Sequence, residues 1–112
     1  MKFHHNKNFK YHELWNGHLH LAGDCNIDID TLGKLFSDHS VPTCTGNFAI
    51  VWVGNDGWNF AQTDHLNTYP IWYKEDGSEL YSLWSQVEDI QRDDVFYAMR
   101  DLLYGQMTVG TR

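Results

Sequence analysis

The strongest pattern in the chain is an apolar run from Asn47 to Val53. Side chains alternate along an extended strand, so this run would be hydrophobic on both of its faces. The two faces carry Phe48, Ile50 and Trp52, and Ala49, Val51 and Val53. A strand of this kind has to be covered on both sides. The pattern therefore predicts a central strand with another layer above it and another below.

Two hairpins follow from the turn signals around this run. Gly54-Asn55-Asp56-Gly57 leads into an alternating strand over residues 58–63. Farther on, strands over residues 70–74 and 79–83 flank Glu75-Asp76-Gly77-Ser78, in which the glycine accepts a positive φ angle. The connection over residues 63–70 joins the two hairpins.

A third hairpin is predicted near the N-terminus. Residues 9–15 and 18–22 flank Asn16-Gly17, a pair typical of two-residue hairpin loops. This loop would place Trp15 opposite His18 and Glu13 opposite His20. Leucines 14, 19 and 21 would then point inward from the other face. Residues 1–8 are polar, and we expect this segment to be loose at its start.

Helices are expected in three places. Asp30 can cap a helix over residues 31–38, in which Leu32, Leu35 and Phe36 share one face. Residues 85–90 suggest a helical turn. A longer helix is expected to begin at Asp93-Asp94 and to end at Gly105. Its buried stripe would be Val95, Phe96, Met99, Leu102 and Leu103. Residues 106–112 carry no local signal.

Several of these unlike elements, in this order and spacing, resemble one known family. The chain is similar to the class II glutamine amidotransferase domain at the N-terminus of asparagine synthetases. The matching positions are Gly46, Phe48, Ala49, Asp64, Pro70, Tyr73 and Ser85. The resemblance implies an α+β fold, a shortened Ntn-hydrolase-like αββα sandwich of antiparallel sheets with at least two helices. Residues 1–112 would form a single degenerate domain of this type.

The departures from the family pattern concern its chemistry. Family members use an N-terminal cysteine whose own amino group acts as the base, whereas this chain begins Met1-Lys2-Phe3. Thr63, Asn67 and Gln86 stand where the family has Arg, Gly and Glu. The stretch before Gly46 is also short for such a domain, so missing strands should leave an edge or a face uncovered. The resemblance thus implies a non-catalytic domain without a cofactor, which docks on an ATP-dependent amide-forming synthetase of the asparagine synthetase type or on itself.

Composition narrows the partner class further. The 112 residues suit one small domain, and the net charge of −7 opposes binding to nucleic acid or to an anionic membrane surface. No apolar run approaches the ~20 residues of a spanning helix. The N-terminal residues contain no apolar segment of a secretion signal. We therefore expect a cytoplasmic protein.

Two clusters could carry metal or thiol chemistry. His18 and His20 lie two residues apart, with Glu13 expected opposite His20, and such a set could bind zinc or another divalent ion. Two ligands at this spacing are a weak pattern, so we expect a solvated hairpin face with a Glu13–His20 pair and no metal. Cys25 and Cys44 are expected to be inert thiols rather than a disulfide or a nucleophile.

Two further alternatives concern polar and aromatic residues of the central region. Asp64-His65 could act in acid–base chemistry, but a turn that organises the strand after Pro70 is the preferred interpretation. The aromatic residues could form a sugar- or peptide-binding shelf, although core packing explains them as well. They are Trp52, Trp58, Trp72, Tyr73 and Trp84. A small ligand- or metal-binding module using aromatic or histidine side chains therefore stays an alternative function, as does a residual glutamine amidotransferase.

Overall fold

One sheet of the protein contains five strands and surrounds the apolar run. The computed structural model describes residues 1–88, 95–102 and 105–109. The strand order in this sheet is β2-β3-β4-β5-β9, with every neighbouring pair antiparallel. The strands are β2 (Phe9–Leu14), β3 (Gly17–Cys25), β4 (Gly46–Gly54), β5 (Asn59–Thr63) and β9 (Gln106–Val109).

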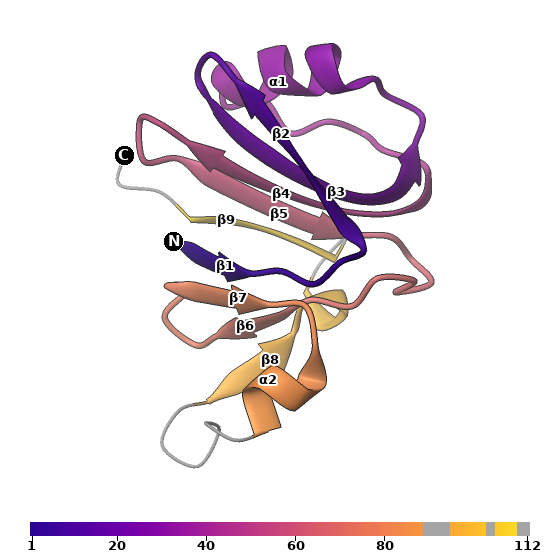
Figure 1. Ribbon diagram of the computed structural model, residues 1–112, viewed down its shortest axis with the longest axis vertical. Coiled ribbons are helices and arrows are strands. Elements are labelled where there is room, and N and C mark those ends of the chain that lie inside the picture. Colours follow the sequence, from indigo (N-terminus) through magenta and orange to yellow (C-terminus); the bar gives the residue numbers. More distant parts are fainter. Residues whose placement is uncertain (89–94, 103–104, 110–112) are drawn as a thin grey trace.

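A second, smaller sheet packs against the first. Its strand order is β1-β7-β6-β8, and β1 pairs with β7 in the parallel direction. These strands are β1 (Lys2–His4), β7 (Glu79–Tyr81), β6 (Trp72–Lys74) and β8 (Phe96–Ala98). Helix α1 (Ile29–Ser37) covers the outer face of the five-stranded sheet, and α2 (Trp84–Glu88) lies beside the smaller sheet at the other end of the molecule (Figure 1). The fold class is thus α+β, with two mainly antiparallel sheets and two helices, as the sequence predicted.

The central strand β4 is buried on both faces, which confirms the expectation from its apolar pattern. Phe48, Ile50 and Trp52 belong to a core beneath α1, which we call the helix-side core. Ala49 and Val51 belong to a second core between the two sheets, which we call the inter-sheet core. The alternation of side chains along β4 therefore divides the protein's hydrophobic interior into two parts.

Helix α1 forms where the sequence predicted it, but with a different cap. The N-cap is Asp28 rather than Asp30, because the Asp28 carboxylate accepts hydrogen bonds from both the backbone N–H and the hydroxyl of Thr31. Asp30 lies in the first turn, where its negative charge suits the helix dipole. Leu32 and Phe36 are buried and attach the helix to the sheet.

The N-terminal hairpin is present, but its predicted register is wrong. Glu13 lies opposite His18, and Leu14 lies opposite Gly17, so the loop is Trp15-Asn16. Gly17 lies in β3, and a Cβ atom there would lie 2.5 Å from the backbone oxygen of Val53 in β4, so this position requires glycine. The glycine that the sequence assigned to the turn is thus needed within β3, where this strand approaches β4 closely.

Both ends of the chain differ from the expectation. Residues 2–4 form β1, whose backbone pairs with β7, so this segment is not loose. The expected helix from 93 to 105 is absent from its described part, which contains β8 and a short 3₁₀ helix, η1 (Met99–Asp101). Backbone pairing of β8 with β6 overrides the helical spacing of the apolar residues. Residues 93, 94, 103 and 104 of that prediction lie outside the described residues, and residues 106–109 form β9.

The other local predictions agree with the structure. β4 and β5 form the hairpin around 54–57, and β6 and β7 form the hairpin around Asp76-Gly77, where Gly77 has a φ of 75°. The helical turn predicted from residue 85 corresponds to α2, although Ile90 lies outside the described residues. None of the helices in the described ranges is long and apolar enough to cross a membrane.

Candidate functional site

Three residues of the amidotransferase-like pattern meet at one corner of the five-stranded sheet. Gly46 begins β4, Phe48 follows two residues later, and Asp64 comes directly after β5. The Asp64 side chain accepts the backbone N–H of Phe48 at 2.9 Å through one oxygen and that of Thr68 at 2.9 Å through the other. Asp64 is only 7% exposed. Its carboxylate therefore ties the connection after β5 to the start of β4.

Gly46 has a structural reason to be glycine at this corner. Its φ angle is 120°, and a Cβ atom there would lie 2.5 Å from the backbone oxygen of Asp24 in β3. A larger residue would strain the backbone and push β3 away from β4. The opening glycine of the pattern thus sets how closely the two strands pair.

The remaining pattern residues are spread over other parts of the fold. Ala49 is fully buried in the inter-sheet core, and Pro70 and Tyr73 lie before and within β6. Ser85 is exposed on α2. These four residues do not join Asp64 in one cluster. Ala49 has a structural role in β4, and the other three lie at the second sheet or on its helix.

The acid–base alternative for Asp64-His65 loses support from this geometry. Both carboxylate oxygens of Asp64 accept backbone hydrogen bonds, so neither is directed at His65. The backbone N–H of Asn67 also donates to the Asp64 carbonyl, and Asn67 adopts a φ of 54°. The segment is a tight turn stabilised by Asp64, in agreement with the preferred interpretation.

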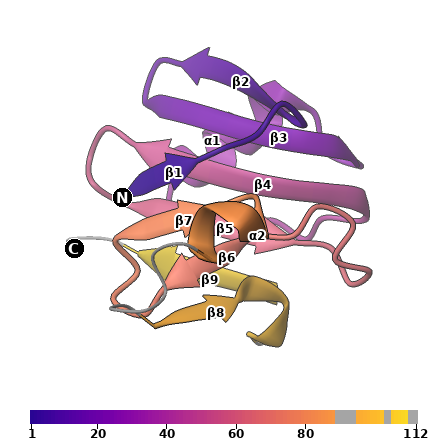
Figure 2. The same cartoon turned by 60° about the horizontal axis from the view of Figure 1, so that its bottom comes forward.

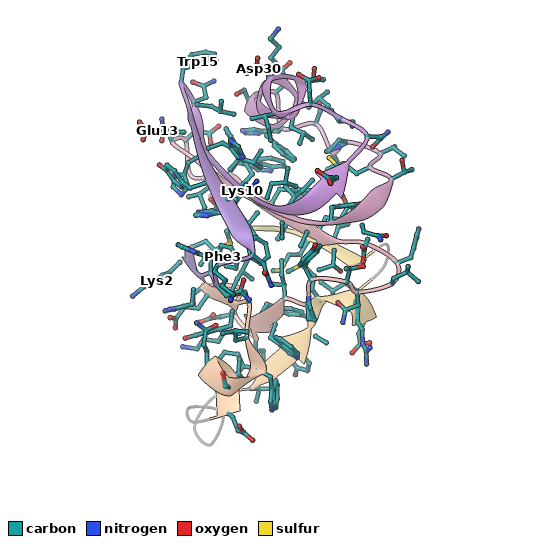
Figure 3. The ribbon with its side chains drawn as sticks, turned by 45° about the vertical axis from the view of Figure 1, so that its right-hand side comes forward. Lys2, Phe3, Lys10, Glu13, Trp15 and Asp30 are labelled. Carbon is teal, nitrogen blue, oxygen red and sulfur yellow. The ribbon has the colours of Figure 1, made fainter. Side chains whose placement is uncertain are left out.

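The metal candidates Glu13, His18 and His20 occupy one sheet face, on which Glu13 is exposed and His18 half-buried, but His20 is buried. His20 is 6% exposed, and its ring lies 5.2 Å from that of His18 and 5.0 Å from that of His5, between centroids. Phe3 of β1, which is labelled in Figure 3, packs edge-on to His20, so the smaller sheet covers His20. The expected Glu13–His20 pair is replaced by Tyr11 opposite His20. The part of the chain that the structure describes contains no group of three metal-ligating side chains able to hold an ion.

Burial controls the electrostatics of this histidine cluster. The pKa of His20 is lowered to about 4, mainly by desolvation, with smaller contributions from the nearby His18 and His5. Desolvation also lowers the pKa of His18, although the Glu13 carboxylate opposes this effect. The Nδ1 atom of His20 has no hydrogen-bond partner within the described ranges. His20 is thus a buried, neutral ring at the contact between the two sheets.

The two cysteines are free thiols at the border of the helix-side core. The Cys25 thiol donates a hydrogen bond to the carbonyl of Ile27 at 3.3 Å. Burial, with a further contribution from Cys25, raises the pKa of Cys44 to about 12. A thiol with such a pKa is protonated at neutral pH and is a poor nucleophile. This agrees with the expectation of inert cysteines.

Two pockets were not identified from the sequence. One, of about 310 Å³, lies beside the Asp64 corner and is bordered by Cys44, Gln62, His65 and Gln106, among others. The other, of about 180 Å³, is bordered by Asn6, Asn8, Tyr69, Trp72, Ser82 and Trp84, among others. The sequence suggests the tryptophans as part of a possible ligand-binding surface, but the asparagines come from the polar N-terminal segment, for which it predicts no helix or strand. No local sequence signal brings these segments together.

Comparisons with known proteins do not assign this geometry to a family. No protein-family model, no curated protein and no solved structure matches the chain. The chemistry of the molecule therefore follows from its own residues. They define a structural turn at Asp64, a protonated Cys44 and concave surfaces that include the two described above.

Proposed function

We propose that this chain is a non-catalytic, glutamine-amidotransferase-like domain that docks on an ATP-dependent, amide-forming synthetase of the asparagine synthetase type. The observation that carries the proposal is a side of the sandwich that no helix or strand of the described ranges covers. There, β8 and β9 are edge strands of their two sheets, and η1 follows β8 (Figure 2). We call this side the open flank and define it by Tyr73, Tyr97, Leu102 and Met107.

The open flank is apolar as well as unpaired. Tyr73, Leu102 and Met107 pack partly buried against the inter-sheet core, and Tyr97 lies opposite Tyr73 with ring centroids 5.6 Å apart. Tyr97 is 42% exposed. In the described ranges β8 pairs only with β6, and β9 only with β5. Edges of this kind are normally covered, because their backbone groups can pair with another chain.

The absence of catalysis is supported by the residues that would have to perform it. Met1 packs partly buried against the inter-sheet core, and its side chain offers no nucleophile. Cys44 is protonated, and the Asp64 carboxylate is engaged by backbone N–H groups. The remaining role for a domain of this ancestry is to bind and position a partner.

The synthetase is the occupant that the family resemblance favours, because in that family a synthetase domain follows the amidotransferase domain along the chain. The charge of this chain also indicates which charge the partner surface should carry. The net charge of −7 makes a basic rim on the synthetase the complementary choice. Such a rim would raise the association rate at low salt.

The docking experiment uses the full chain and a synthetase domain of the asparagine synthetase type that lacks its own amidotransferase domain. Titration calorimetry and size-exclusion chromatography should detect a complex. Tyr97→Asp, which places a charge on the open flank, should weaken it about tenfold or more. Trp15→Asp is the matched control, because Trp15 is 81% exposed on the distant β2–β3 loop. It should bind normally.

Two outcomes would contradict the docking proposal. A chain that stays monomeric and binds no synthetase domain would remove its basis. A homodimer broken by Tyr97→Asp would show that the open flank accepts a second copy instead.

A separate assay tests the lack of catalysis. Ammonia release from glutamine by the isolated chain should equal that of buffer alone. Release that is abolished by Cys44→Ala would establish residual amidotransferase activity instead.

A further inference from the structure

Three segments that are far apart in the sequence meet around the 180 Å³ pocket. The loop between β1 and β2 supplies Asn6 and Asn8, Tyr69 lies before β6, and Trp72 begins β6. Ser82 lies between β7 and α2, and Trp84 begins α2. The pocket therefore lies where both sheets and α2 come together, on scaffolding that fixes its walls.

Aromatic faces form one wall of this pocket. Trp72 and Trp84 have ring centroids 5.5 Å apart with their planes tilted by 55°, so their faces do not cover each other completely. Trp84 remains 39% exposed although tryptophan has the largest apolar surface of any side chain. An exposed tryptophan within a concave surface is a favourable contact area for a ligand.

Polar groups also line the pocket. The Asn6 side chain donates to the backbone oxygen of Ser82 at 3.4 Å and accepts the backbone N–H of Asn8 at 2.8 Å. These bonds hold the β1–β2 loop at the mouth of the pocket. Among the described residues, no partner engages the side-chain amide of Asn8 or the hydroxyl of Thr68. Both groups can therefore bond to a ligand.

The described residues of the lining include no charged side chain, in a protein with a net charge of −7. A charged ligand would find no counter-ion, so the pocket suits a neutral molecule. That molecule needs an apolar face for the tryptophans and hydroxyl groups for the asparagine and threonine. A pyranose ring has both, with its C–H groups on one face and hydroxyls around its edge.

From this arrangement we infer that the pocket formed by Trp72, Trp84 and Asn8 binds a neutral pyranose sugar. The ring stacks on the exposed face of Trp84 and its hydroxyls bond to the Asn8 amide and the Thr68 hydroxyl. The enclosed volume of about 180 Å³ suits a single ring rather than an extended chain. This inference is independent of the proposed docking function, because it uses none of the residues of the open flank.

The test is a titration of the full chain with glucose, galactose, N-acetylglucosamine, maltose and cellobiose. Two-dimensional ¹H–¹⁵N NMR should show shifts of the indole N–H signals of Trp72 and Trp84 for at least one sugar. Trp84→Ala should weaken that binding about tenfold or more, and Asn8→Ala about threefold. Trp15→Ala removes an exposed tryptophan outside the pocket and should leave the affinity unchanged.

The same spectra define the contrary results. The inference would be overturned if none of the five sugars shifted the Trp72 or Trp84 signals. It would also be overturned if the shifts persisted in both Trp84→Ala and Asn8→Ala. A proline-rich peptide that shifts these signals when no sugar does would identify a peptide site instead. If Trp84→Ala fails to fold, Asn8→Ala decides, since Asn8 is exposed and outside the core.

Discussion

Both faces of β4 are buried, but the side chains in the two cores that bury them differ in size. On the helix side the buried residues are mostly large: Leu19, Leu32, Phe36, Phe48, Ile50, Trp52 and Phe60. Between the sheets, the five-stranded sheet contributes small residues at its centre: Ala22, Ala49, Val51 and Ala61. Large side chains fill the space under a single helix, whereas small ones let a second sheet approach closely.

The two cores also differ in where their residues come from. The helix-side core uses residues from 14 to 60, a continuous part of the chain. The inter-sheet core combines Phe3 and Phe9 with Leu80, Met99 and Met107. Its assembly therefore depends on contacts between distant segments, which cost more loop-closure entropy. The helix-side core should resist perturbation of the chain ends better than the inter-sheet core does.

The largest effect is expected from emptying the helix-side core. Trp52 is 1% exposed, and its ring stacks on that of Phe36 with centroids 5.5 Å apart. Trp52→Ala should lower the free energy of unfolding by about 3–5 kcal/mol, because the lost contacts leave a cavity. Urea unfolding followed by circular dichroism measures the loss. Trp15→Ala should cost less than about 0.5 kcal/mol, and equal losses in the two variants would contradict the assigned burial.

The next effect is a loss of stability in acid, which should arise from the inter-sheet side. The pKa of His20 is lowered to about 4 in the folded protein, so the unfolded chain binds the proton first. Stability is therefore complete above about pH 6.5, the ordinary histidine value, and falls as the pH drops toward 4. His20 alone would contribute up to about 3 kcal/mol of this loss.

Urea unfolding at a series of pH values measures this loss. His18 adds to it, since its pKa is also lowered. His20→Leu removes the main titrating group, so the variant should lose much less stability between pH 6.5 and 4. An unchanged pH dependence in this variant would show that His20 is not protected between the sheets.

A smaller effect is expected from overfilling the inter-sheet core. Ala61 is fully buried between Val51 and Met107, its neighbours on the adjacent strands. Ala61→Leu should lower the free energy of unfolding by about 1–3 kcal/mol, because the sheets would have to separate. Ile50→Leu conserves volume on the helix side and should cost less than about 1.5 kcal/mol. A neutral Ala61→Leu would mean that the gap between the sheets is not tightly packed.

The sequence predicted the parts of the fold that local patterns determine. The double-sided strand β4, the two central hairpins and helix α1 all carry alternation, turn residues or helical spacing within a few positions. By contrast, β1 and β9 are short edge strands whose pairing partners lie far away in the sequence. The prediction of a helix at β8 was wrong for a related reason. The apolar spacing of this segment fits a helix, but its backbone hydrogen bonds are made by pairing with β6.

The candidate sites show the same division. Asp64 was correctly interpreted as a turn residue, because its role depends on residues four and sixteen positions away. His20 was wrongly placed on a solvated face, because Phe3 of β1 covers it, and the pairing of β1 with β7 joins segments that are far apart in the sequence. The aromatic pocket joins segments more than 60 positions apart. No pattern within one segment could have indicated it.

The smallest effect is expected from a substitution in α1, on the helix side of β4, and it should be stabilising. Gly33 lies in the middle of α1, where alanine is more favourable by up to about 1 kcal/mol. A Cβ atom there would lie 2.5 Å from Cδ1 of Leu14, the end of a flexible side chain that can move aside. Gly33→Ala should therefore raise the free energy of unfolding by a few tenths of a kcal/mol, up to ~1. Thermal unfolding measures the change, and a clear loss of stability would show that Leu14 is held as rigidly as the aromatic residues beneath the helix.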